Sequence, residues 1–150
     1  MLIQELLELS PLRLITALPN TSVSEAARRM ARFGVGLVVI MDDDDGVAGV
    51  LSERDIVIAL GSDELDLDEA EVGDFMTEDV VTVAQSDSIL DAVGAMNKHG
   101  IRHLVATEGG RAVGVLSIRD VLRYCAKQLL DVGEEENEQL TMDFVKALAA

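Results

Sequence analysis

The sequence predicts an α+β protein built from two copies of one β-α-β-β-α unit. The chain overlays itself at an offset of 66 residues, which places Ser22 over Ser88 and Gly34 over Gly100. Between each serine and its glycine, apolar residues recur at the i, i+3, i+4, i+7 spacing of an amphipathic helix. Each helix is followed by two short apolar runs joined by a glycine-containing turn, which is typical of a β-hairpin.

The individual elements follow in chain order. A serine followed three residues later by an acid predicts a helix N-terminus, because the serine oxygen accepts a backbone N–H and the acid reaches back to the cap. This pair occurs four times, at Ser22–Glu25, Ser52–Asp55, Ser88–Asp91 and Ser117–Asp120. Gly34 and Gly100 are expected to end the first helix of each copy. The first copy is expected to hold a strand at 12–18, a helix at 23–33, strands at 35–41 and 47–51, and a helix from Ser52. The second copy repeats this order, with a strand at 79–85, a helix at 89–99, strands at 101–107 and 112–116, and a helix from Ser117.

One phrase is written twice, as GVLSERD at 49–55 and GVLSIRD at 114–120. The offset is 65 there, because one residue is lost in the turn that reads DDDDG in the first copy and TEGGR in the second. Taken alone, each Ser-x-x-Asp is a capping box and indicates no ligand. Ser22 and Ser88 head boxes of the same kind, so a functional meaning for the other two depends on the rest of the repeat.

The repeat gives an expected domain layout. We expect a first domain at 1–65, a second at 66–130, an acidic connector at about 61–74, and an acidic tail at 131–150. The stretch 131–139 of the tail is expected to be mobile. A short helix after it would carry one apolar stripe, formed by Leu140, Phe144, Val145 and Leu148.

Composition excludes several classes of function. The net charge of −16 argues against a nucleic-acid surface, which needs clustered basic residues. Only Arg28, Arg29 and Arg32 cluster, and their spacing fits the solvated face of one helix. No apolar run approaches the roughly 20 residues that span a bilayer, so no membrane partner is expected. Cys125 is the single cysteine, and the N-terminus lacks the basic start of a signal peptide, which favours a cytoplasmic location.

The ordered set of features resembles a tandem pair of cystathionine-β-synthase (CBS) domains. The resemblance covers about residues 10–125 and includes, in each copy, an early threonine, a helix ending in glycine and a closing Gly-x-x-Ser-x-x-Asp. The strand GIRHLV and the opening MTEDVVTV of the second copy also match. The resemblance implies two domains packed as one pseudo-symmetric module. It also implies a homodimer of such modules and a cleft between the domains that takes an adenine nucleotide (AMP, ADP or ATP).

The resemblance also assigns ligand-binding residues by position. Serine and aspartate of Ser-x-x-Asp would lie near the phosphate and the ribose hydroxyls; these are Ser52 and Asp55 in one half-site, and Ser117 and Asp120 in the other. An early strand threonine would lie near the base, at Thr16 and Thr82. The strand that lines the cleft would contribute Val35, Gly36 and Leu37 in the first copy, and Ile101, Arg102 and His103 in the second.

The chemistry of these residues agrees with such a ligand. A helix N-terminus offers free N–H donors and partial positive charge to a phosphate. A carboxylate suits the neutral ribose diol, from which it can accept two hydrogen bonds. Arg54 and Arg119 stand between serine and aspartate in the two copies and would neutralise phosphate charge. Arg102 and His103 give the second half-site more polar capacity, although neighbouring strand residues face opposite ways, so His103 is equally a candidate for the core.

We therefore expect a regulatory, energy-sensing binding module that acts on a regulated partner protein and needs no cofactor. Enzymatic activity is not expected, because Cys125 has no histidine at a spacing that would place a base beside it. The acidic run Asp42–Asp45 reads as a solvated turn, because it lacks the ligand spacing of a calcium loop. The alternatives are the same fold with NAD(H), S-adenosylmethionine or a magnesium-bound nucleotide, and a ligand-free dimerisation scaffold.

Overall fold

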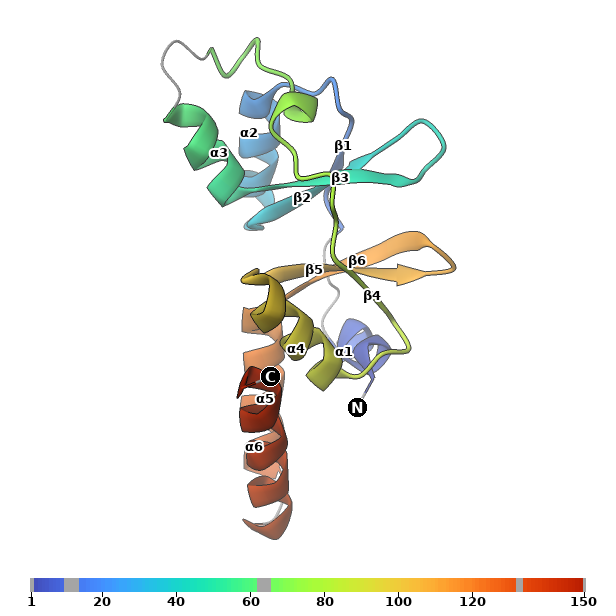
Figure 1. Cartoon of the computed structure of the whole chain (residues 1–150), viewed down its shortest axis with the longest axis vertical. Helices are drawn as coiled ribbons and strands as arrows, with labels where there is room; N and C mark the ends of the chain where they lie inside the picture. Colours follow the sequence, from blue (N-terminus) through green and yellow to red (C-terminus); the bar gives the residue numbers. More distant parts are fainter. Residues whose placement is uncertain (1, 10–13, 62–65, 132–133, 150) are drawn as a thin grey trace. The chain divides into compact units, whose positions relative to one another are not determined.

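The computed structural model describes residues 2–9, 14–61, 66–131 and 134–149, and it divides into two compact units (Figure 1). The β1-β2-β3 unit comprises Arg13–Val80 with Gly109–Val113. The β4-β5-β6 unit comprises Met1–Leu12, Val81–Glu108 and Gly114–Ala150. Each unit holds a three-stranded sheet with helices, so the predicted α+β class is confirmed.

The sheet of the β1-β2-β3 unit contains a parallel and an antiparallel pair. It is formed by β1 (Thr16–Ala17), β2 (Leu37–Met41) and β3 (Val47–Ser52), with β2 in the centre. β1 runs parallel to β2 with Thr16 opposite Val39, and β3 returns antiparallel with Ser52 opposite Leu37. Helices α2 (Val23–Phe33) and α3 (Glu53–Leu60) lie on the same side of this sheet (Figure 1).

The core of this unit is the apolar stripe expected from the helical spacing. α2 buries Val23, Ala26 and Met30. They pack with the buried sheet residues Val38, Ile40 and Leu51. Gly34 ends α2 with a φ of 64°, in the left-handed region where glycine is favoured, and Gly100 ends α4 (Ile89–His99) in the same way with a φ of 63°.

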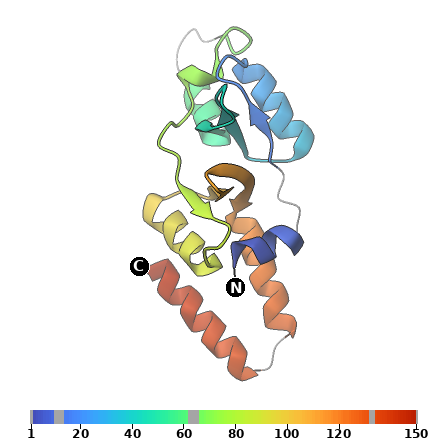
Figure 2. The same cartoon turned by 90° about the vertical axis from the view of Figure 1, so that its right-hand side faces the viewer.

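The β4-β5-β6 unit repeats this plan and adds two helices. Its strands are β4 (Thr82–Ala84), β5 (His103–Glu108) and β6 (Arg111–Ser117), with β5 in the centre; the first three residues of β6 are grouped with the other unit. Its helices are α1 (Ile3–Leu9), α4 (Ile89–His99), α5 (Ile118–Asp131) and α6 (Glu134–Ala149). α6 packs on α4 (Figure 2). α1 is fixed by Ile3 N and Gln4 N, which donate to the Asp87 and Gln85 carbonyls at 2.9 Å each.

Several elements differ from the sequence expectation. α1 was not predicted, and α6 has 16 residues and begins inside the stretch that was expected to be mobile. The apolar stripe predicted for the tail falls largely on Leu140, Phe144 and Leu148, whose side chains lie outside the described residues. The leading strands are also shorter than predicted, with two residues in β1 and three in β4. Each of these strands pairs with a neighbour on one side only.

The acidic connector is partly described, and the chain just after it pairs with the sheet of the β1-β2-β3 unit. It contains a short 3-10 helix, η1 (Val72–Asp74). Thr77 then pairs with Val50 of β3 through two hydrogen bonds of 2.8 and 3.0 Å. A Cβ on Gly49 would lie 2.7 Å from Met76 Sδ and 3.0 Å from the Thr77 carbonyl oxygen, so a side chain at this position would crowd the segment that pairs with β3. The division at 65/66 stays a prediction, and the β1-β2-β3 unit continues to Val80.

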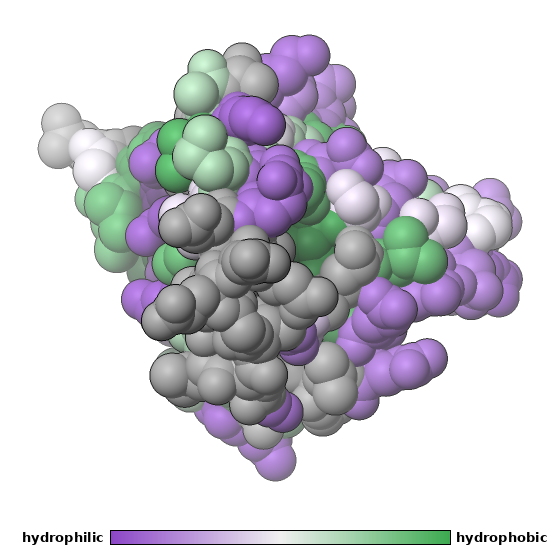
Figure 3. Space-filling model, turned by 90° about the horizontal axis from the view of Figure 1, so that it is seen from below, coloured by the Kyte–Doolittle hydropathy of each residue, from purple (hydrophilic) through white to green (hydrophobic). Residues whose placement is uncertain are grey.

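Among the residues coloured by hydropathy in the view from below, hydrophilic ones predominate, with hydrophobic residues among them (Figure 3). This agrees with a chain of 28 acidic and 12 basic residues. Within the described residues, no helix is both long enough and apolar enough to cross a bilayer.

Candidate functional site

The two copies of the repeated phrase each place a Ser-x-x-Asp at the start of a helix. In the β1-β2-β3 unit, Ser52 N and Ser52 Oγ each donate to Asp55 Oδ2 at 2.7 Å, and Asp55 N donates to Ser52 Oγ at 3.3 Å. In the β4-β5-β6 unit, Ser117 N donates to Asp120 Oδ2 at 3.2 Å, Ser117 Oγ donates to the same oxygen, and Asp120 N donates to Ser117 Oγ at 3.2 Å. Both are therefore complete capping boxes.

A capping box alone does not distinguish these positions from others in the chain. Ser88 and Asp91 make the same three contacts at the start of α4, at 3.2, 2.7 and 3.0 Å. The box predicted at Ser22 is different, because Ser22 Oγ accepts from Glu25 N while the Glu25 carboxylate accepts from Arg29 Nε at 3.0 Å. A ligand role for Ser-x-x-Asp therefore depends on what else lies beside it.

Strand residues lie beside both helix starts. In the first half-site, Glu53 N donates to the Gly36 carbonyl at 3.1 Å, and Leu37 is the strand partner of Ser52. In the second half-site, Ile118 N donates to the Arg102 carbonyl at 2.9 Å. The structure thus brings Gly36 and Leu37 to Ser52, and Arg102 to Ser117, within one unit each.

Exposure differs among the strand candidates. Leu37 is buried and Val35 and Gly36 are half-buried in the first copy. In the second copy Arg102 is exposed, whereas Ile101 and His103 are half-buried. His99, by contrast, is an exposed residue at the end of α4. The second half-site therefore presents a charged side chain to solvent where the first presents glycine.

The central strand of each sheet separates the early threonine from the serine of the same copy. Thr16 pairs with Val39 of β2, and Thr82 pairs with Val105 of β5. Thr16 is half-buried and Thr82 is exposed. β2 separates Thr16 from Ser52, so a ligand that touches both must span two strand spacings, roughly 10 Å.

Arg123 is a candidate that sequence reasoning missed. Its Nη1 lies 3.4 Å from Asp120 Oδ1, the carboxylate oxygen that the cap leaves unused. The Arg123 side chain is 74% exposed and that of Asp120 only 21%, so the cation covers a largely shielded carboxylate. The i, i+3 spacing from Asp120 was the available signal. The corresponding residue of the first copy is Ile58.

The two half-sites therefore differ in charge. Arg54 is the cation near the start of α3, and its side chain is exposed. The start of α5 has exposed Arg102, Arg119 and Arg123. Because the chain as a whole is strongly acidic, these three guanidinium groups make the second half-site the more favourable place for an anion.

The structure gives little support for a nucleophilic role of Cys125 or for a metal site. Burial raises the pKa of the Cys125 thiol, which lowers the thiolate fraction that a nucleophile needs. In the part of the chain that the structure describes, no three His, Cys, Asp or Glu side chains lie close enough to hold a metal ion. Asp42 instead organises its own turn, with Oδ1 accepting from Asp44 N at 2.9 Å and from Gly46 N at 2.7 Å.

The chain is similar to several known proteins. An uncharacterised 17.7 kDa protein of Acidianus ambivalens is 36% identical over 115 residues, which cover 76% of this chain and 66% of that protein. Across three curated relatives, the matched region covers 35% to 66% of the relative's own length.

Solved structures match nearly the whole fold. A CBS-domain containing protein of Agrobacterium tumefaciens is 29% identical with a TM-score of 0.78, covering 83% of this chain and 98% of that one. A CBS domain protein of Pyrobaculum aerophilum, solved as a complex with AMP, is 31% identical with a TM-score of 0.75, covering 88% of this chain and 100% of that one.

The family match agrees with the internal repeat. The CBS domain model matches residues 9–62 and again residues 72–127. These two stretches contain the two copies of the β-α-β-β-α plan and both Ser-x-x-Asp helix starts. The chain therefore belongs to the CBS domain family and carries two CBS domains in tandem.

Proposed function

We propose that this CBS pair is a regulatory module that senses an adenine nucleotide, with AMP as the preferred ligand. The observation that carries the proposal is the likeness to the Pyrobaculum protein complexed with AMP, which is 31% identical across 88% of this chain. The arrangement of side chains at the start of α5 supports it. The proposal assigns the chain a binding role and no catalytic step.

The proposed binding mode uses the β4-β5-β6 half-site. The N-terminus of α5 and the Ser117 hydroxyl meet the phosphate, because the positive end of the helix dipole favours an anion there. Arg102 and Arg119 are exposed next to this helix start and neutralise the phosphate charge. Thr82 lies across β5, where a nucleotide extended from phosphate to base reaches it.

Asp120 holds the ribose in this binding mode. Its Oδ2 remains in the capping box, and its Oδ1 accepts hydrogen bonds from the ribose hydroxyls in place of the 3.4 Å contact with Arg123. Arg123 is long and 74% exposed, so it can turn towards the phosphate when the ribose arrives. The half-site with Ser52, Arg54 and Asp55 is the weaker of the two, because Gly36, Leu37 and Ile58 bring no charge.

A thermal-shift panel tests the ligand. A ligand present at 100 times its dissociation constant stabilises the native state by about 2.7 kcal/mol. In a chain of this length that corresponds to a rise in melting temperature of roughly 5–10 °C. With each nucleotide at the same concentration and at low salt, we expect this rise with AMP and smaller rises with ADP and ATP, because a chain of net charge −16 repels the more highly charged nucleotides.

The panel also contains NAD(H) and S-adenosylmethionine, which are the alternative ligands for this fold. A larger rise with either one would assign the site to that ligand. No rise with any compound, on protein shown by mass spectrometry to be free of bound nucleotide, would favour a ligand-free dimerisation scaffold.

The assembly we propose is a homodimer. α3 exposes three large apolar side chains, with Val57 and Ile58 each 66% and Leu60 59% exposed. Light scattering at micromolar concentration is expected to give about twice 16.1 kDa. Ile58→Glu is expected to shift the mass towards the monomer, because it would bury a charge in an apolar contact. Leu18→Glu, on a 50% exposed leucine outside α3, is the matched control and should leave the dimer intact. A wild-type protein that is purely monomeric under these conditions would refute the dimer.

A further inference from the structure

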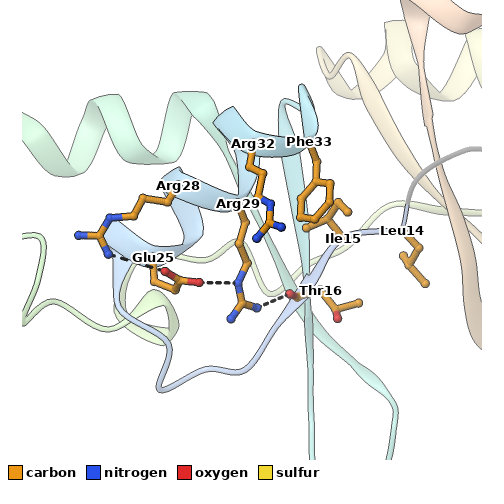
Figure 4. Close-up of a pocket in the computed structure, with 8 residues that line it drawn as sticks. All are labelled: Leu14, Ile15, Thr16, Glu25, Arg28, Arg29, Arg32 and Phe33. Carbon is orange, nitrogen blue, oxygen red and sulfur yellow. Dashed lines mark hydrogen bonds and ion pairs between the residues drawn. The ribbon is translucent and has the colours of Figure 1, made fainter.

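A pocket of about 690 Å³ lies in the β1-β2-β3 unit, between α2 and the chain that leads into β1 (Figure 4). Arg29 crosses this space, donating from Nε to Glu25 Oε1 at 3.0 Å and from Nη1 to the Thr16 carbonyl at 2.8 Å. Its side chain is only 36% exposed. The expectation of a solvated arginine face holds for Arg28, which is 67% exposed and turned outwards, but it fails for Arg29.

One side of the same pocket is apolar. Leu14, Ile15 and Phe33 contribute its hydrocarbon and aromatic surface. The guanidinium carbon of Arg32 lies 5.4 Å from the centre of the Phe33 ring, within the range of a cation–π contact. Figure 4 shows Arg32 directed into the space between Arg29 and Phe33. The pocket therefore combines two guanidinium groups with an apolar wall.

The second repeat shows that the fold does not require Arg28 or Arg29, although it keeps a cation, Lys98, at the position of Arg32. At the offset of 66, Gly94 and Ala95 of α4 stand where α2 has Arg28 and Arg29. Both helices have 11 residues, begin at a capping serine and end at a left-handed glycine. Three of the chain's 12 basic residues, Arg28, Arg29 and Arg32, lie at this one location. A structural role common to both copies therefore cannot explain Arg28 and Arg29.

We propose that this pocket is a separate binding site for a small organic anion, namely a phosphate or carboxylate group carried on a planar apolar body. Arginine binds such oxyanions through paired N–H donors, and Arg29 is already oriented by its hydrogen bond to the Thr16 carbonyl. The apolar body lies against Ile15 and Phe33. The volume falls within the range of small-molecule pockets, roughly 300–1,000 Å³. Among the residues that line this pocket, only Thr16 is also a candidate for nucleotide contact, in the half-site of Ser52.

Phenyl phosphate is the first probe, observed through the arginine Nε–Hε signals in ¹⁵N NMR spectra. We expect saturable shifts of the Arg29 and Arg32 signals with phenyl phosphate. Inorganic phosphate should bind more weakly, because it lacks the ring, and benzyl alcohol should not shift these signals, because it lacks the charge. Benzoate distinguishes the two anion classes, since tighter binding of benzoate than of phenyl phosphate would assign the site to carboxylates.

Three variants test the role of the charges. Arg32→Gln should weaken phenyl phosphate binding about tenfold, through loss of a charge-assisted hydrogen bond. Lys98→Gln alters the matching exposed cation of α4 and should leave binding unchanged. Glu25→Gln should tighten binding severalfold, because it removes the carboxylate that competes for Arg29. The Ser22 cap survives this change, because Ser22 Oγ accepts from the backbone N of residue 25.

The site would be refuted if phenyl phosphate produced no saturable shift, or if Lys98→Gln weakened binding as much as Arg32→Gln. Weaker binding in Glu25→Gln would likewise show that the anion does not meet Arg29. Arg32 and Asp120 belong to different units, so Arg32→Gln should leave AMP affinity unaltered. The two proposals can therefore fail independently.

Discussion

Asp120→Asn is expected to weaken AMP binding by about ten- to a hundredfold in calorimetric titration. A hydrogen bond to a charged group contributes roughly 1.5–3 kcal/mol, and an asparagine side chain offers the ribose a neutral acceptor in place of a carboxylate. The substitution keeps the size of the side chain. It also keeps an oxygen that can accept from Ser117 N, as Asp120 Oδ2 does in the native cap.

Asp91→Asn is the matched control, because it separates the cost of a weakened cap from the loss of a ligand contact. Asp91 closes a box with Ser88 that has the same three contacts as the box of Ser117 and Asp120, and both lie in the β4-β5-β6 unit. Each variant should lose up to about 1 kcal/mol of folding stability. Only Asp120→Asn should lose affinity. Equal affinities in wild type and both variants would mean that the repeated phrase only starts helices.

Much of the fold could be predicted, because its signals are local. The glycines at 34 and 100 end their helices in the left-handed conformation that their position indicated. Both hairpins form where the alternation of short apolar runs and turns predicted them. Helix α1 was missed because a helix of seven residues is not stable by itself; it is held by tertiary burial of Ile3 and Leu6, which are 0% and 2% exposed.

The functional assignments depended on distances that a sequence does not contain. Helical spacing predicted that Arg28 and Arg29 share one solvated face, yet only the fold shows that Arg29 reaches the Thr16 carbonyl. The capping pattern likewise predicted Glu25 as the partner of Ser22, whereas a nearby arginine takes its carboxylate. In both cases a long side chain had several possible partners within reach, and its tertiary neighbours determined which of them it contacts.

Leu51→Ala and Leu116→Ala are expected to cost about 2–5 kcal/mol of unfolding free energy each, the range for large-to-small changes in a packed core. The two leucines occupy the same position of the repeated phrase, on β3 and β6, and both are 0% exposed. Leu51 packs with the α2 residues Val23, Ala26 and Met30. Each truncation leaves a cavity that the surrounding side chains fill only in part.

Hydrogen exchange of strand amides measures this loss separately in each unit. Leu51→Ala should speed exchange in β2 and β3, and Leu116→Ala should speed it in β5 and β6.

AMP at 100 times its dissociation constant should restore about 2.7 kcal/mol to the unit that binds it. If the nucleotide binds at Asp120, that recovery should appear in Leu116→Ala at the β5 and β6 amides. Leu18→Ala, at a 50% exposed position outside the proposed dimer contact, should change stability by no more than about 0.5 kcal/mol. If Leu51→Ala or Leu116→Ala lost no more than about 0.5 kcal/mol of stability, the substituted leucine would not be packed as described. Recovery confined to β2 and β3 would instead move the nucleotide to the half-site of Asp55.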